Sequence, residues 1–170
     1  MLDTNICIYM MNKRSPNVIE QIKRHMNDGL CISSITLSEL EYGAAKSTNY
    51  ERNIVAIQKI LSLFTVLPYD EAAASCYGAI RAQLERKGQI IGPLDMLIGA
   101  HAKSKGLVLV TNNMKEFKRI EGLVVEDWSA PFTLSGDYTN ERHALLEENS
   151  IDDISARIKG RKEQGGQVDF

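Results

Sequence analysis

Four acidic side chains lie where the surrounding sequence is apolar or neutral. They are Asp3 in MLDTN, Glu39 in SSITLSELEYGAA, Asp95 in GPLDMLIGA and Glu116 shortly after VTNN. A carboxylate near a protein core is unfavourable unless it is paired, hydrogen-bonded or bound to a metal ion. Three or four carboxylates that converge from separate elements form an oxygen-rich site of the kind that binds Mg²⁺ or Mn²⁺.

Such a site can hydrolyse a phosphodiester. A divalent ion lowers the pKa of a bound water and stabilises the charge that develops in an in-line displacement at phosphorus. One carboxylate can accept the proton of that water, so no histidine is required. His25, His101 and His143 are dispersed and lack zinc-type spacing, which argues against a zinc site or a Ser-His-Asp triad.

Each acid also has a structural interpretation that spacing leaves open. Asp3 can cap the N-terminus of the helix that follows it, a role compatible with metal binding. Glu39 can lie on a solvated helix face, and Asp95 can be a first-turn acid that the helix dipole favours. Glu116 lies among lysines and can be an ordinary surface acid.

The elements that must position these acids alternate between short apolar runs and helical periods. The runs predict strands at 30–33, 65–67, 108–111 and 124–125. The periods predict helices from about residue 5, over SSITLSELEYGAA, and over 16–26, 51–64, 71–87 and 93–105, with Asp70 as an N-cap and Gly88 and Gly106 as terminators. We therefore expect an α/β fold, a three-layer domain with a central parallel sheet of about four or five strands flanked by helices.

The predicted sheet places the candidate site at one edge. Ligands of open α/β sheets bind beyond the carboxyl ends of the strands. Asp3 and the turn 111–113 both follow predicted strand ends. Glu39 and Asp95 can join them if their helices begin on the same side.

The composition is that of one ordinary soluble domain. The chain has 170 residues, 44% hydrophobic and 25% charged, with 20 Lys and Arg against 22 Asp and Glu. These values exclude a disordered, collagenous or disulfide-stapled protein. The near-neutral charge argues against non-specific wrapping of nucleic acid and is compatible with a local basic rim. A domain of this size needs no metal to hold its core, so a metal would serve chemistry.

The cysteines and the chain start indicate a reducing, cytoplasmic setting. Cys7, Cys31 and Cys76 are odd in number and lie in apolar runs, as buried free thiols do. The sequence has no signal-type start and no apolar stretch of about 18 residues. Only two residues precede Asp3, whereas a buried strand runs about five, so we expect the natural start to lie upstream of Met1.

The residue pattern of the chain changes after residue 130. Residues 131–170 lack strand-like runs and contain an acidic segment at 141–153 followed by the basic ISARIKGRK at 154–162. We expect residues 1–130 to form the main domain and residues 131–170 to form a partly helical or disordered C-terminal extension.

Several motifs together resemble one family. The stretches MLDTNICIYMM, CISSITLSELEYGAAKS, ERNI, GPLDMLIGAHAKSKGLVLVTNNMKEFKRIEGL and VEDW are similar, in this order over residues 1 to about 129, to PIN-domain ribonuclease toxins of the VapC type. The resemblance implies an Mg²⁺- or Mn²⁺-dependent endoribonuclease that cuts RNA of the tRNA or rRNA class. It also implies a VapB-type antitoxin partner in a type II toxin–antitoxin system.

The resemblance also assigns the acids. Asp3, Glu39 and Asp95 match the three principal metal-site acids of such proteins. For the fourth, many PIN domains carry an acid at the position of Asn113, and a branch with Thr-Asn-Asn carries it at that of Glu116. We favour Glu116 as a catalytic and metal-binding acid, with Asn113 as its neutral neighbour.

Polar and basic residues around these acids are candidate supports. Hydroxyl and amide groups that can orient an acid or a phosphate are those of Thr4, Asn5, Thr111, Asn112 and Asn113, although each can equally serve a turn or cap. Basic residues near helix ends can form a rim that contacts phosphates, and each of them can instead be an ordinary surface charge. They are Lys13, Arg14, Lys46, Arg52 and Lys87.

Self-association and regulation follow from the same resemblance. A homodimer is implied, and the face of Ile54, Ile57, Leu61 and Phe64 can serve it or pack in the core. The basic end of the extension loosely resembles an antitoxin segment whose cations would pair with the acids: Arg157, Lys159, Arg161 and Lys162.

Two other functions are compatible with parts of the sequence. A catalytically silent PIN-like module that binds RNA or protein is one alternative, and a self-inhibited toxin fused to an antitoxin-like tail is another. A flavodoxin-like nucleotide binder is disfavoured, because no G-x-G-x-x-G or G-x-x-x-x-G-K-[ST] motif follows any predicted strand.

Overall fold

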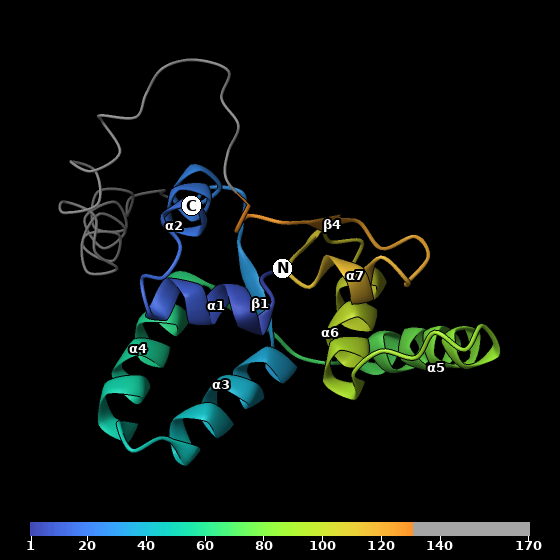
Figure 1. Ribbon diagram of the computed structural model, residues 1–170, viewed down its shortest axis with the longest axis horizontal. Coiled ribbons are helices and arrows are strands. Elements are labelled where there is room, and N and C mark those ends of the chain that lie inside the picture. The colour runs from blue at the N-terminus through green and yellow to red at the C-terminus, as the bar shows by residue number, and fades with distance from the viewer. Residues whose placement is uncertain (131–170) are drawn as a thin grey trace, which may run out of the picture.

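The structure is a computed structural model that describes residues 1–130, and the predicted alternation of strands and helices runs through them (Figure 1). The expectations for the extension concern residues 131–170 and lie outside the described residues. The elements in chain order are α1 (Thr4–Met11), α2 (Pro16–Arg24), β1 (Cys31–Ser33), α3 (Ser34–Lys46), α4 (Tyr50–Leu63), β2 (Thr65–Leu67), α5 (Glu71–Arg86), α6 (Pro93–Ser104), β3 (Leu109–Val110), α7 (Met114–Phe117) and β4 (Val125–Glu126).

The strands form a parallel sheet in which a single residue occupies the central position. β1 pairs with β2, β3 pairs with β4, and both pairs are parallel. Leu2 bridges Ile32 on one side and Val110 on the other, again in parallel. The order is therefore β2, β1, Leu2, β3, β4, which confirms the expected parallel sheet of about four or five strands.

The central position is held by the same backbone hydrogen bonds as a longer strand. The Leu2 N–H donates to the Cys31 carbonyl over 2.8 Å, and the Asp3 N–H donates to the Val110 carbonyl over 2.9 Å. Because all strands run the same way, Asp3, the start of α3 and Thr111 come to one edge of the sheet.

Alternating side chains of the sheet face two helical layers. Leu2, Ile32 and Val110 pack in one hydrophobic cluster with residues of α1, α2, α3 and α4. Their neighbours Cys31 and Leu109 pack in a second cluster with residues of α5, α6 and α7. The two sets of helices lie on opposite sides of β1 in Figure 1. This is the three-layer arrangement expected from the sequence.

The helix ends follow local chemistry. Asp70 caps α5 by accepting from the Ala73 N–H over 3.0 Å, as predicted. Gly88 and Gly106 follow α5 and α6 with φ of 62° and 63°. A left-handed backbone of this kind favours glycine and ends each helix.

The buried face of α4 differs in part from the prediction. Ile57, Ile60 and Phe64 are buried, whereas Leu61 is 38% exposed. Leu61 was expected to pack either in the core or against a partner, and it lies outside the core of its own chain: the core contacts follow the positions 57, 60 and 64 around the helix. Ile57 belongs to the core of its own chain, so it is not available as part of a dimer surface.

The three cysteines are free thiols, as expected from the sequence. Cys7 and Cys31 are buried, Cys76 is half-buried, and all three are free. Among the described residues, no helix has the length and apolar character needed to cross a membrane. The short helix α7 was not predicted as a separate element.

Candidate functional site

A pocket of about 410 Å³ opens where α1, α3 and α6 meet at the carboxyl edge of the sheet. We call it the acid pocket. It collects three of the four predicted acids and two of their predicted polar neighbours, Thr4 and Asn5. Its lining consists of Asp3, Thr4, Asn5, Ile8, Ser38, Glu39, Tyr42, Leu94 and Asp95.

Asp3 is the most buried of these acids, with 2% of its surface exposed. It caps α1, since one carboxylate oxygen accepts from the Thr4 N–H over 2.7 Å. The other oxygen accepts from the Thr111 hydroxyl over 2.8 Å. Burial raises the pKa of Asp3, these hydrogen bonds oppose that rise, and the charge of Glu39 adds to it. Asp3 therefore both caps α1 and lines the acid pocket.

Asp95 lies in the first turn of α6, two residues after Pro93. Its pKa is raised to about 7, first by burial, then by the charge of Asp3, and then by a hydrogen bond with Glu116. The side-chain amide of Asn113 donates to Asp95 Oδ2 over 3.1 Å. Asp95 therefore holds a proton near neutral pH that an isolated carboxyl would have lost.

Glu39 reaches the pocket from α3 and is held by α1. The Thr4 hydroxyl donates to Glu39 Oε2 over 2.5 Å, while the Thr4 backbone caps onto Asp3. Thr4 therefore joins the two acids through its own backbone and side chain. A solvated helix face for Glu39 is excluded, because its carboxylate is engaged and half-buried at the pocket wall.

Glu116 lies beside the acid pocket rather than in its lining. Its carboxylate accepts from the Gly92 N–H over 3.2 Å and is hydrogen-bonded to Asp95. It is therefore not an isolated surface acid. The Asn113 side chain contacts Asp95 instead of capping α7. The structure thus brings both candidates for the fourth position to the same neighbour.

The remaining predicted supports behave differently from one another. The Thr111 hydroxyl accepts from the Asn113 N–H over 3.0 Å while it donates to Asp3. Asn112 instead donates to the Tyr9 hydroxyl over 2.8 Å, which ties β3 to α1. The backbone of Asn5 also lowers the pKa of Asp3 by hydrogen bonding.

The structure places the predicted rim residues in different surroundings. Lys87 forms an exposed ion pair with Glu121, which agrees with the alternative interpretation of Lys87 as surface charge. Lys13 and Arg14 follow the C-terminal end of α1, the opposite end from Asp3. Lys46 lies beside the acid pocket, since its Nζ is 5.9 Å from the ring centroid of Tyr42, which lines the pocket.

The exposed apolar residues of the lining were not among the predicted site residues. Tyr42 and Leu94 are 67% and 44% exposed. Their spacing from the acids could have indicated both residues. Tyr42 follows Glu39 by about one helical turn, and Leu94 directly precedes Asp95.

The donor set fits a hard divalent cation, although the side chains do not form a ready-made cage. Within residues 1–130, no three His, Cys, Asp or Glu side chains are gathered closely enough to hold one ion. Glu39 is turned to Thr4 and Glu116 to Gly92. The charges of Asp3, Glu39 and Glu116 nevertheless raise the pKa of Asp95. A cation relieves repulsion of this kind, and carboxylate oxygens are its preferred protein ligands.

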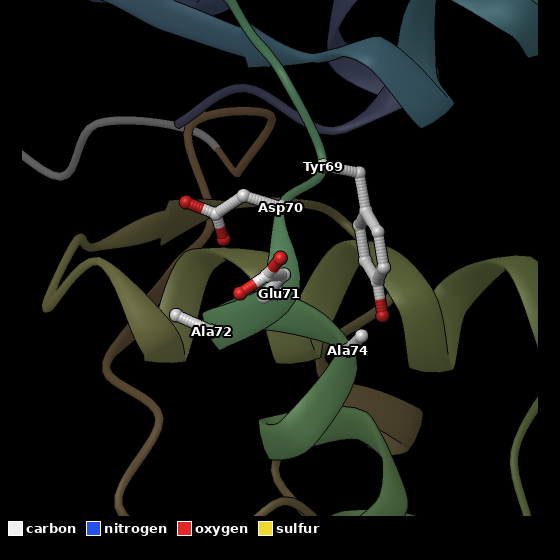
Figure 2. A pocket seen from close by; sticks show the side chains of 5 residues that line it. All are labelled: Tyr69, Asp70, Glu71, Ala72 and Ala74. Carbon is white, nitrogen blue, oxygen red and sulfur yellow. The ribbon is translucent and has the colours of Figure 1, made fainter.

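A second hollow lies at the start of α5 and shares no residue with the acid pocket. Figure 2 shows its lining, with the carboxylate of Asp70 on one side of Glu71 and the ring of Tyr69 on the other. Asp70 caps α5 and pairs with Lys105, and Glu71 is a first-turn acid that the helix dipole favours. Helix formation explains both acids.

Comparison with known proteins places the described part of the chain in a well-populated group. A family model described as PIN domain matches residues 1–123. The chain is 51% identical over 130 residues to the tRNA(fMet)-specific endonuclease VapC of Shigella flexneri, which covers 76% of this chain and 97% of that protein.

Solved structures give the same grouping. VapBC2 from Rickettsia felis bound to a DNA fragment from their promoter matches with a TM-score of 0.72 and 41% identity, over 75% of this chain and 97% of that one. DNA-bound VapBC from Salmonella typhimurium matches with a TM-score of 0.72 and 48% identity, over 75% and 96%.

Proposed function

The chain belongs to the PIN-domain family and, within it, to the VapC ribonucleases, and on this basis we propose that it is a metal-dependent endoribonuclease and the toxin of a type II toxin–antitoxin pair. The observation that carries the proposal is the acid pocket. It joins Asp3, Glu39 and Asp95, which are distant in sequence, with Glu116 bonded to Asp95 from outside.

In this proposal the four acids, Asp3, Glu39, Asp95 and Glu116, hold Mg²⁺ or Mn²⁺. The ion, when bound, activates water and neutralises the charge of the phosphodiester. The protein contributes the placement of the carboxylates. Thr111 and Thr4 fix Asp3 from two sides, and Thr4 also fixes Glu39. Asp95, whose pKa is about 7 in the metal-free protein, would release its proton when the cation binds.

The proposed substrate is RNA of the tRNA or rRNA class. The name of the Shigella flexneri relative, a tRNA(fMet)-specific endonuclease, supports tRNA as the first substrate to test. The proposed reaction belongs in the cytoplasm, where these RNAs occur.

The proposed protein partners are a VapB-type antitoxin and a second copy of the chain. The VapBC complexes among the similar solved structures support the antitoxin. Since Ile57 lies in the core, a dimer surface on α4 would use exposed residues such as Val55 and Leu61.

We propose that residues 1–130 form the nuclease domain and residues 131–170 a separate extension. The family model ends at residue 123, and the relatives match over about 130 residues of this chain. The extension is therefore additional to what these relatives contain. Regulation of the acid pocket by its basic segment is the hypothesis that its sequence suggests.

The test is cleavage of a tRNA(fMet) transcript and of total bacterial RNA by the purified chain. Mg²⁺, Mn²⁺ and EDTA are compared, with Asp3→Asn and the exposed-acid control Glu41→Gln alongside. Metal-dependent cutting that Asp3→Asn abolishes and Glu41→Gln preserves supports the proposal. Cutting only after residues 131–170 are deleted would indicate inhibition by the extension. Absence of cutting by both forms would favour a silent binding module.

A further inference from the structure

Two exposed apolar side chains stand at the rim of the acid pocket, one on each wall. Tyr42 on α3 is 67% exposed, more than any other large hydrophobic residue in the described part of the chain. Leu94 on α6 is 44% exposed. Both line the pocket, and neither belongs to the two hydrophobic clusters of the core. Folding of the domain therefore does not explain their apolar character.

Their positions tie them to the acids. Tyr42 follows Glu39 by three residues, which places the two on one face of α3. Leu94 directly precedes Asp95 in the first turn of α6. An apolar side chain thus flanks a carboxylate on each wall, and a group held between Tyr42 and Leu94 lies next to the proposed site of hydrolysis.

We propose that Tyr42 and Leu94 form a base-binding platform, on which an unstacked base of a single-stranded RNA segment lies against the Tyr42 ring beside the phosphate to be cut. This inference rests on the proposed ribonuclease function and adds how the RNA is held. Aromatic side chains stack on bases of any identity, and proteins that read RNA in loops use them in this way.

Lys46 completes the platform with a positive charge. Its ammonium lies 5.9 Å from the Tyr42 ring centroid, within the range of a cation–π contact. The contact orients the ring and holds a cation at the rim of a pocket whose other charges are negative. A nucleotide stacked on the free face of the ring would place its phosphate near this cation.

The rest of the lining suits a nucleotide. The volume of about 410 Å³ falls within the range of about 300–1,000 Å³ that is usual for small-ligand sites. Ser38 and Asn5 are exposed polar residues in the same lining, so they offer hydrogen bonds to a sugar or base edge. A base in a duplex is already stacked and paired, so the platform favours loops and single strands.

The experiment measures kcat and KM for cleavage of a tRNA(fMet) transcript by the full chain and by single variants. Tyr42→Ala removes the ring, Tyr42→Phe retains it, and Leu94→Ala shortens the opposite wall. Tyr50→Ala is the matched control, because Tyr50 is 48% exposed but lies on α4, outside the acid-pocket lining. Melting temperatures confirm that each variant is folded, as expected for exposed positions.

We expect Tyr42→Ala to raise KM by about tenfold, because this corresponds to the binding free energy that alanine substitution removes from one base–aromatic stack. Leu94→Ala should raise KM less, by about threefold, because an alkyl side chain contributes less contact. Tyr42→Phe and Tyr50→Ala should stay within about twofold of the parent chain. A rise in KM for Tyr42→Ala with kcat largely retained identifies loss of binding rather than damage to the acids.

An abasic substrate separates stacking from other effects of Tyr42. Abasic nucleotides are introduced one at a time around the cut site, and one of them should weaken cleavage by the parent chain as much as Tyr42→Ala does. The same abasic RNA should cause no further loss with Tyr42→Ala. Additive losses, or cleavage unchanged by Tyr42→Ala, would overturn the platform. If neither the full chain nor the chain without residues 131–170 cuts RNA, the proposed function itself fails, so the two failures are distinguishable.

Discussion

Thr111 and Asp3 are 108 positions apart in sequence, and the hydroxyl of Thr111 donates to Asp3 Oδ2 over 2.8 Å. The same hydroxyl accepts from the Asn113 N–H over 3.0 Å. Thr111, which directly follows β3, is therefore joined both to Asp3, the residue after the central Leu2, and to the turn that carries Asn113. Thr111 acts as a positioning residue, because its contact with the site is through Asp3.

Replacing Thr111 by valine tests this role. The Thr111→Val side chain has a similar shape but no hydroxyl, so Asp3 loses the partner of one oxygen while the packing is largely kept. Loss of a residue that orients a metal ligand weakens metal affinity or activity by about 10–100-fold. We expect this loss in Mn²⁺ affinity, measured by calorimetry, and in RNA cleavage.

Thr111→Ser is the matched control, because it restores the hydroxyl. It should recover most of the Mn²⁺ affinity that Thr111→Val loses. Equal affinities for all three proteins would show that the hydrogen bond to Asp3 does not position a ligand.

The identity of the fourth acid is open to a rescue experiment. Glu116 and Asn113 both contact Asp95, and only Glu116 is acidic. We expect Glu116→Gln to lower kcat/KM for RNA by about 10–100-fold. Adding Asn113→Asp to this variant should restore part of the activity, because the new carboxylate lies beside the same neighbour. A double variant no better than Glu116→Gln would confine the role to position 116.

The raised pKa of Asp95 predicts how stability depends on pH without metal. The folded protein holds this proton up to about pH 7, whereas the unfolded chain releases it near the ordinary value. The stabilisation is therefore complete at low pH and is lost as pH rises through about 7. Asp95→Asn removes the ionisation and should raise the free energy of unfolding at pH 8 by about 1–2 kcal/mol, after allowance for solvent screening of a half-buried group.

Thermal melts in EDTA at pH 5 and pH 8 measure this effect. The parent chain and Asp95→Asn should differ more at pH 8 than at pH 5, while Glu41→Gln, which alters an exposed acid on α3, should behave as the parent at both. Adding Mg²⁺ at pH 8 should stabilise the parent and leave Asp95→Asn nearly unchanged. A difference between Asp95→Asn and the parent chain that is larger at pH 5 than at pH 8 would contradict the sign of the shift.

The sheet and the acids of the pocket were largely predictable because local patterns specify them. The strand-like runs, the cap at Asp70 and the helix-ending glycines each depend on a few neighbouring residues. Asp3 follows a strand end that the parallel sheet brings to one edge, and Glu39 and Asp95 lie on helices that reach the same edge. The resemblance to a known family then distinguished these three acids from the other Asp and Glu residues of the chain as the metal-site candidates.

The parts that were missed depend on contacts between distant segments. Whether Ile60 or Leu61 faces the core depends on the rotation of α4 against α1 and the sheet, which its own periodicity leaves uncertain by about one residue. The bond from Asn112 to Tyr9 joins two elements far apart in the chain. The ion pair of Lys87 with Glu121 likewise has no signal in the local sequence.

Gly99 connects this packing to the site and supplies a last prediction. A Cβ atom built at Gly99 on α6 would collide with the Ile120 side chain and lie 3.3 Å from Phe117. Phe117 is fully buried and directly follows Glu116 on α7. Overpacking of a filled core costs about 1–3 kcal/mol, so Gly99→Ala should lower the free energy of unfolding by that amount. Displacement of α7 should also weaken Mg²⁺-dependent stabilisation.

Gly78→Ala is the opposite case on α5, since a Cβ there meets nothing within 4 Å. Alanine is the better helix former, so this variant should gain up to about 1 kcal/mol and keep the parent's response to Mg²⁺. Urea unfolding with and without Mg²⁺ measures both quantities for both variants. If Gly99→Ala were as stable as Gly78→Ala, α7 would be free to shift without cost, and the close approach of α6 to α7 would not be what holds Glu116 beside Asp95.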